Sequence, residues 1–244
     1  MCRTTISRTL PLFAGVALVG SLAWSGGLAS GATASAGRAA VKAPHGAYGN
    51  FELSNWGGYV AHETPRSFTT ATANWTEANA TCRKTSEYYA PWVGIDGWNA
   101  DTVEQTGVQT DCSTGKPVDS AWYEMYPKLP VFYSNPVSTG DKITATVSAS
   151  GDTYTMTISD LTKGWTETTT KSNSNAESAS AEAVIEAPGG YPTLKAVKFT
   201  GVEFNGRPLD DFSLIKLETD TKSPITYTPT AIKNGEDFNM VPES

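Results

Sequence analysis

The sequence predicts an all-β protein, built as a β-sandwich or a barrel. Short alternations of apolar and polar residues recur along the chain, and residues typical of turns separate them. No segment combines a 3.6-residue apolar period with helix caps. Many short strands joined by frequent turns are typical of two packed sheets or of one closed sheet.

The clearest predicted strand covers residues 143–149. Ile143, Ala145, Val147 and Ala149 alternate with polar residues, which is the period of a half-buried strand. Residues 150–152 (Ser-Gly-Asp) then form a turn signal, and a second alternation follows at 154–158. We therefore expect an antiparallel hairpin here.

A second informative segment is residues 197–206. Val197 and Phe199 alternate, but after Gly201 the phase shifts to Val202 and Phe204. Such a shift predicts a β-bulge, and Asn205-Gly206 follows as a turn signal. Further strands are expected at Trp56–Val60, Phe68–Trp75, Ala90–Ile95, Ala121–Tyr126 and Ile225–Thr228.

Composition limits the possible functions. The chain has 244 residues, 39% hydrophobic and 18% charged, which suits one folded domain. Its net charge is -7 and its pI is about 4.9. Because nucleic-acid binding needs clustered Lys and Arg, we expect no nucleic-acid partner.

The N-terminal segment has the pattern of an export signal. Arg3 and Arg8 precede an apolar run from Leu10 to Trp24, and Ala-Ser-Ala at 34–36 is a cleavage pattern. Proline and glycine interrupt this run, which argues against the alternative of a retained membrane anchor. We expect a signal peptide at 1–36, a secreted extracellular protein and no membrane association after its removal.

The remaining chain divides into a short lead-in and one domain. Residues 37–50 have no strand pattern and are expected to be a flexible lead-in or a short pro-segment, and residues 51–244 form the folded domain. Cys82 and Cys112 remain once Cys2 is removed, which predicts a disulfide in an oxidising compartment. The alternative, a catalytic thiol, would need His45 or His62 as its partner.

Several catalytic chemistries lack their residues. The sequence has no G-x-S-x-G, no H-E-x-x-H, no cysteine cluster and no pair of D-[TS]-G loops. It also has no glycine-rich phosphate loop, so we expect neither a metal nor a cofactor. Carboxylates and amides are the groups that remain for catalysis.

Polar residues stand inside aromatic-rich segments that occur in a fixed order. These segments are NWGG at 55–58, WVGIDG at 92–97, QTG at 105–107, AWYE at 121–124 followed by Pro127, and AE-x-x-x-E at 181–186. In this order they resemble the glutamic peptidases, the eqolisin or G1 family of secreted, acid-acting endopeptidases. The resemblance covers about residues 54–186.

The resemblance implies a fold, a reaction and a site. The fold would be a sandwich of two curved, mostly antiparallel sheets (concanavalin A-like or jelly-roll-like), with polypeptide substrate in the groove of one concave face. The catalytic pair would be Gln105 and Glu182. The residues that match those lining or supporting the cleft are Trp56, Trp92, Asp96 and Glu124. We also expect a monomer.

Simpler roles for these residues remain open from the sequence. Gln105 and Glu182 can be solvated strand residues, Trp56 and Trp92 core aromatics, and Asp96 a turn residue. A β-sandwich glycoside hydrolase and a non-catalytic, lectin-like carbohydrate-binding module would use similar side chains.

Two positions depart from the family pattern. Ala183 stands where many relatives have Trp, and Asp119 lies one residue before the position, here Ser120, where an acid is frequent. Because strand neighbours point to opposite faces, we expect the Asp119 carboxylate to point away from the cleft.

Overall fold

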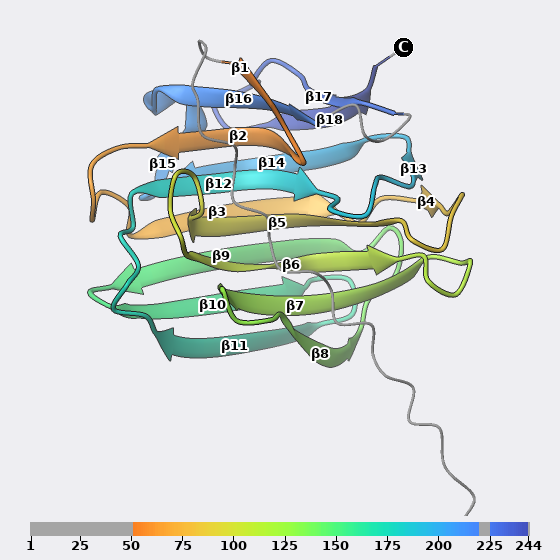
Figure 1. Ribbon diagram of the computed structural model, residues 1–244, viewed down its shortest axis with the longest axis horizontal. Helices are drawn as coiled ribbons and strands as arrows, with labels where there is room; N and C mark the ends of the chain where they lie inside the picture. The colour runs from red at the N-terminus through yellow and green to blue at the C-terminus, as the bar shows by residue number, and fades with distance from the viewer. Residues whose placement is uncertain (1–50, 220–224, 244) are drawn as a thin grey trace, which may run out of the picture. The chain divides into compact units, whose positions relative to one another are not determined.

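The computed structural model describes residues 51–219 and 225–243, which form two large β-sheets packed face to face (Figure 1). The predicted signal peptide and lead-in, residues 1–50, lie outside the described residues. Within the described part, helical structure is limited to the short 3-10 helix η1 (Leu209–Asp211), so no helix there is long enough to cross a membrane.

The first sheet, sheet A, is antiparallel except where β1 pairs with β16 in parallel. Its order is β1 (Phe51–Ser54), β16 (Leu214–Thr219), β2 (Trp56–His62), β12 (Ser180–Glu186), β5 (Tyr88–Asp96), β6 (Val103–Asp111), β7 (Val118–Tyr126) and β8 (Val131–Pro136).

The second sheet, sheet B, lies behind sheet A in Figure 1 and is antiparallel. Its order is β11 (Trp165–Ser172), β10 (Thr153–Asp160), β9 (Lys142–Ser150), β3 (Thr70–Thr76), β14 (Val197–Phe204), β18 (Phe238–Pro242) and β17 (Tyr227–Pro229), and β15 (Arg207–Pro208) pairs with β14. A small separate sheet joins β13 (Thr193–Leu194) to β4 (Ala80–Thr81). The predicted sandwich of mostly antiparallel sheets is confirmed.

The strands of sheet B follow the predicted alternation. Ile143, Ala145 and Val147 are fully buried between the sheets, and the β9–β10 hairpin pairs Ala145 with Ile158. The predicted bulge in β14 is present, because its register against β3 shifts between Thr200 and Glu203. One face of each strand therefore supplies the core and the other is polar.

Sheet A differs because residues on both faces of its central strands β12, β5 and β6 are buried. Every residue of β12 is buried. Its inner face, with Val93 and Ala181, belongs to the core between the sheets. Its outer face carries a second apolar cluster that includes Trp92, Val184 and Leu217. Polar residues on this outer face are therefore surrounded by apolar side chains.

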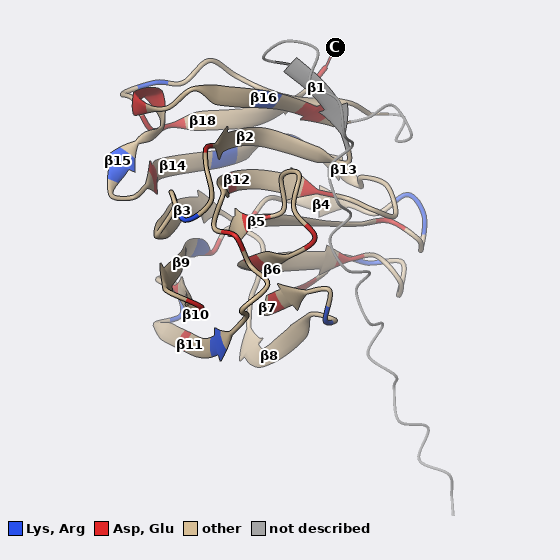
Figure 2. Ribbon diagram, turned by 60° about the vertical axis from the view of Figure 1, so that its left-hand side comes forward, with Lys and Arg blue, Asp and Glu red and all other residues tan. Residues whose placement is uncertain are grey.

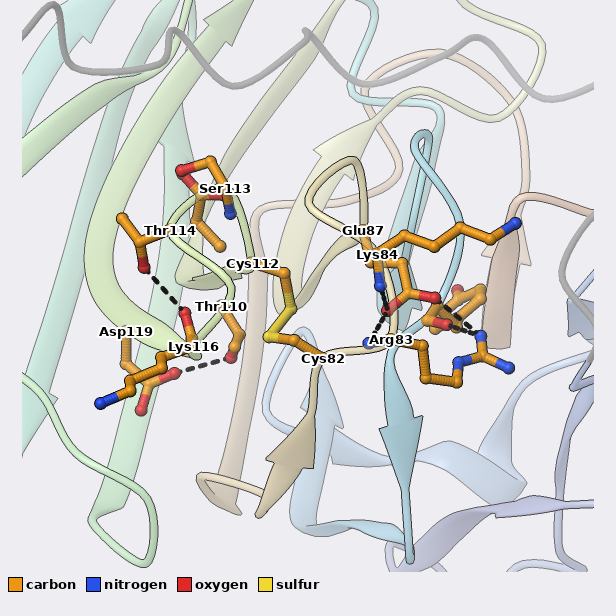
Figure 3. The surroundings of a disulfide bond; sticks show 12 residues. Cys82, Arg83, Lys84, Glu87, Thr110, Cys112, Ser113, Thr114, Lys116 and Asp119 are labelled. Carbon is orange, nitrogen blue, oxygen red and sulfur yellow. Dashed lines mark hydrogen bonds and ion pairs between the residues drawn. A yellow bond between two sulfur atoms is a disulfide. The ribbon is translucent and has the colours of Figure 1, made fainter.

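The predicted disulfide between Cys82 and Cys112 is present (Figure 3). It ties the segment after β4 to the end of β6. Beside it, the Glu87 carboxylate accepts hydrogen bonds from the backbone N–H groups of Arg83 at 2.7 Å and Lys84 at 3.1 Å. Arg83 also forms an ion pair with Glu87 at 2.9 Å. Together these bonds fix the loop that leads into β5.

Replacing both Cys82 and Cys112 with Ala should destabilise the fold without changing the strand order of sheet A. Opening a loop of 30 residues removes a constraint on the unfolded chain of roughly 3 to 4 kcal/mol. Urea unfolding at acid pH would measure this loss. An unchanged midpoint would show that the Glu87 bonds alone hold the loop.

A second buried feature is Glu77, which lies between the sheets. Its carboxyl accepts hydrogen bonds from the Tyr89 hydroxyl at 2.8 Å and the Trp75 indole N–H at 3.2 Å. Burial raises the pKa of Glu77 to about 8, and the nearby Asp119 adds to this rise.

Asp119 accepts a hydrogen bond from Thr110 at 2.7 Å. It lies on the face of sheet A opposite the predicted cleft residues, as expected from its position.

The Glu77 carboxyl makes stability depend on pH. Its folded pKa of about 8 exceeds the unfolded value of about 4.3. Its stabilising contribution is therefore complete below the unfolded pKa and is lost as the pH rises towards 8, by about 1.4 kcal/mol per pH unit. In Glu77→Gln the fall in Tm over this interval should be shallower, and exposed Glu63→Gln should match the parent. An equal slope in Glu77→Gln would contradict this origin.

Candidate active site

The residues predicted to be catalytic lie in one row across sheet A. Glu182 of β12 is opposite Gly94 of β5, Gly94 is opposite Gln105 of β6, and Gln105 is opposite Glu124 of β7. Residues that are directly opposite one another share a face. The strand register therefore brings Glu182, Gln105 and Glu124 to the outer face together, and Figure 2 shows acidic positions along these strands.

Gly94 leaves the space between Glu182 and Gln105 open. The two Cα atoms are two strand spacings apart, about 10 Å, so their side chains can converge only if nothing projects between them. A Cβ atom at position 94 would lie 2.8 Å from the Trp92 ring and 3.3 Å from Cβ of Gln105. The absence of a side chain here is therefore a geometric requirement of the row.

Gln105 is fully buried and held by Glu124. Its Nε2 donates to Glu124 Oε2 at 2.6 Å. In this contact the amide nitrogen is the donor and the carboxyl oxygen is the acceptor. Gln105 Oε1 has no hydrogen-bond partner among the described residues. One N–H and the carbonyl oxygen therefore remain to bind reacting groups.

Glu182 is buried without direct hydrogen bonds. Neither carboxyl oxygen has a partner of ordinary geometry in the described part of the chain. Burial holds the pKa of Glu182 well above its usual value, and the charges of Asp96 and Glu104 raise it further. The nearby Ser180 hydroxyl and Trp98 backbone N–H lower it only in part. The site therefore favours a protonated, neutral Glu182.

Aromatic side chains form the next row of the same face. Trp92 is opposite Gly107, which is opposite Trp122. The Trp92 ring packs edge-on against Trp56 with centroids 4.9 Å apart. The indole N–H groups of Trp92 and Trp122 are buried and have no partner among the described residues. Trp122 was not among the predicted site residues, although its alternation with Glu124 in AWYE places both on one face.

Asp96 has a different position from the other predicted cleft residues. It is fully buried, and its carboxylate accepts backbone N–H bonds of 2.7–2.8 Å from Glu177, Ser178 and Ala179. Its φ is 67° and it is followed by Gly97 with φ 110°, so it also shapes the turn after β5. With its oxygens occupied, Asp96 supports the segment that leads into β12 rather than offering a surface to substrate.

A pocket adjoins the catalytic row on the outer face of sheet A. Its lining residues are Tyr88, Ala90, Gln109, Trp122, Glu124, Pro130, Glu186 and Pro188. Glu186, from the AE-x-x-x-E motif, accepts a hydrogen bond from Asn55 at 3.0 Å. The catalytic row therefore borders on a hollow with aromatic, amide and carboxylate groups.

The chemistry available in this row is proton transfer and hydrogen bonding. No group of at least three His, Cys, Asp or Glu residues in the described ranges is arranged to hold a metal ion. A carboxyl and a carboxamide on opposite sides of an open position can activate water and stabilise a developing oxyanion.

Comparisons with known proteins relate this chain to one peptidase family. Residues 54–235 match the Peptidase A4 family. Aspergillopepsin-2 from Aspergillus niger is 40% identical over 92 residues, which is 36% of this chain and 33% of that protein. The match thus spans about a third of this curated relative.

Solved structures of glutamic peptidases are similar to this chain over a larger part of its length. Scytalido-glutamic peptidase, in complex with a peptide-based transition state analog, is 26% identical with a TM-score of 0.64, covering 78% of this chain and 98% of that one. Aspergilloglutamic peptidase from Aspergillus niger, at 24% identity and a TM-score of 0.54, shares the fold over 64% of this chain and 99% of its own. Because the family match covers most of the sequence, this chain belongs to the Peptidase A4 family, the glutamic peptidase family that its motifs predict.

Proposed function

We propose that this protein is a secreted, acid-acting endopeptidase that hydrolyses peptide bonds with Glu182 and Gln105. The observation that carries the proposal is the row in which these residues face each other across Gly94 on the outer face of sheet A. Family membership favours this function over the glycoside hydrolase and lectin alternatives.

In the proposed reaction Glu182 performs both proton transfers. Burial favours the protonated form as the resting state, and the reaction starts from the ionised fraction. As a carboxylate Glu182 takes a proton from the water molecule that attacks the peptide carbonyl carbon, and it then returns that proton to the nitrogen as the C–N bond breaks. Burial raises the pKa of Glu182, which makes its carboxylate a stronger base and its acid form easier to retain for the second step.

Gln105 stabilises the oxyanion of the tetrahedral intermediate. One Nε2–H bonds to Glu124, and the other donates to the developing oxyanion. The free Oε1 accepts a hydrogen bond from the attacking water. One oxyanion donor contributes about 3 to 4 kcal/mol to lowering the barrier. Glu124 acts by fixing the amide orientation.

The proposed substrate is an extended polypeptide. The solved relative whose structure contains a peptide-based analog supports this choice. The buried indole N–H groups of Trp92 and Trp122 are suitable donors for substrate carbonyl groups, and Trp56 supports Trp92 by edge-on packing. Secretion is supported by the disulfide and by the export pattern of residues 1–36.

Glu182→Gln and Gln105→Ala should each abolish most peptidase activity while the fold is retained. We expect the kcat of Gln105→Ala to fall by about a hundredfold to a thousandfold, and that of Glu182→Gln by at least as much. Casein digestion at acid pH measures activity, circular dichroism checks the fold, and Glu63→Gln is the exposed control. Activity above a few percent of the parent in Glu182→Gln would exclude the proton-transfer role.

Gly94→Ala tests the open position directly. The added methyl group would contact the Trp92 ring and Gln105, so we expect kcat to fall by on the order of a hundredfold. Gly151→Ala is the control, because its Cβ would have no neighbour within 4 Å and its φ of 60° strains the backbone only locally. Parent-like kcat in Gly94→Ala would show that the two side chains do not meet above this position.

A further inference from the structure

A buried polar network lies behind the catalytic row, on the inter-sheet side of sheet A. Its central residue is Glu104, which precedes Gln105 on β6 and therefore points to the opposite face. Glu104 is fully buried, and its Oε1 accepts a hydrogen bond from Asn173 Nδ2 at 2.8 Å. Its Oε2 has no partner within the described ranges.

Asn173 connects Glu104 to the segment that precedes β12. Its side-chain Oδ1 accepts a hydrogen bond from the backbone N–H of Asn175 at 3.2 Å, and its backbone N–H donates to the backbone carbonyl of Asp152 at 2.8 Å. Its side chain therefore closes the turn after β11 while the other end of the amide is held by Glu104. This turn leads directly into residues 177–179.

Residues 177–179 are fixed on both sides of their backbone. Their N–H groups bond to the Asp96 carboxylate of β5. Their carbonyl oxygens accept N–H bonds of 2.6–3.0 Å from the β2–β3 connection, donated by Arg66, Phe68 and Glu63. Glu182 follows three residues after Ala179, so the placement of this segment sets where β12 begins.

The charge state of Glu104 suits a neutral hydrogen bond. Burial raises the pKa of Glu104 to about 8, and the charge of Asp96 contributes. At acid pH the carboxyl is therefore protonated and its carbonyl oxygen accepts from Asn173. A glutamine side chain has the same shape and can make the same contact.

Burying the Glu104 carboxyl costs free energy, and an apolar side chain could fill the same volume without that cost. An unpartnered buried polar oxygen such as Oε2 destabilises the fold. A leucine would fill a similar volume without that cost. What Glu104 adds over leucine is the hydrogen bond to Asn173.

We propose that Glu104 is a positioning residue for the peptidase reaction: through Asn173 it holds the β11–β12 connection in place and so sets Glu182 opposite Gln105. This inference rests on the proposed peptidase function. Glu104 touches neither substrate nor the reacting atoms, and it acts through the backbone of the segment before β12.

The first test compares Glu104→Leu with Glu104→Gln. We expect Glu104→Leu to have a Tm equal to or above that of the parent, but a kcat about tenfold lower with KM within about twofold. Glu104→Gln should keep kcat within about twofold of the parent, since it keeps the contact with Asn173. A fully active Glu104→Leu would overturn the inference and leave Glu104 as a packing residue.

The second test is a double-variant cycle on the same hydrogen bond. Asn173→Ala removes the donor to Glu104, so its kcat should also fall at least about tenfold. In Glu104→Leu/Asn173→Ala kcat should be close to that of Asn173→Ala, because both changes remove the same contact. A double variant whose kcat falls by the product of the two single losses would contradict the coupling.

Hydrogen exchange separates this inference from the proposed function. The amides of Glu177, Ser178 and Ala179 should exchange faster in Glu104→Leu than in the parent and in Glu104→Gln. Unchanged exchange would overturn the positioning role whether or not the protein cleaves peptides. A parent protein without peptidase activity, combined with faster exchange in Glu104→Leu, would refute the proposed function and retain the structural link.

Discussion

The register of β12, β5, β6 and β7 is the constraint on which the site depends. Because side chains alternate between faces, a slip of one residue in β12 or β6 would send Glu182 or Gln105 into the core between the sheets, and a slip in β7 would do the same to Glu124. The register is fixed from outside the row by the Asp96 bonds to residues 177–179. It is also fixed by Gly107, where a Cβ would lie 2.3 Å from the Pro91 carbonyl oxygen.

Two kinds of polar contact in the sandwich do not depend on ionised carboxylates. On the outer face of sheet B, hydroxyl groups pair across strands, as between Thr72 and Thr146 at 3.1 Å and between Thr157 and Thr168 at 3.2 Å. Inside, burial keeps Glu77 and Glu104 protonated at acid pH. Hydroxyl pairs do not titrate and protonated carboxyls carry no charge, so acid does not remove these interactions.

Strands could be predicted from the sequence most clearly where one of their faces is exposed to solvent. The segments 143–149 and 154–158 alternate clearly because sheet B is solvated on its outer side, and their hairpin could be predicted. β6 and β12 show no such alternation because their residues are buried on both faces. Gln105 and Glu182 were therefore found through family motifs rather than through periodicity. Glu104 and Asn173 lie 69 positions apart, and no local pattern connects them before the chain folds.

The use of an amide beside a carboxyl follows from the crowding of acids in this part of the fold. Burial raises the pKa of Glu182 most, and the neighbouring acids Asp96 and Glu104 add to the rise, so a second carboxyl at position 105 would be buried beside further acidic groups. In the proposed reaction a glutamine at position 105 donates an N–H to the oxyanion without adding charge, and it also gives Glu124 a hydrogen-bond donor at 2.6 Å. A neutral partner leaves Glu182 as the proposed proton carrier of the pair. Gly94 stands between the two residues in the row, where a Cβ would lie 3.3 Å from Cβ of Gln105, so a larger residue there would crowd the pair.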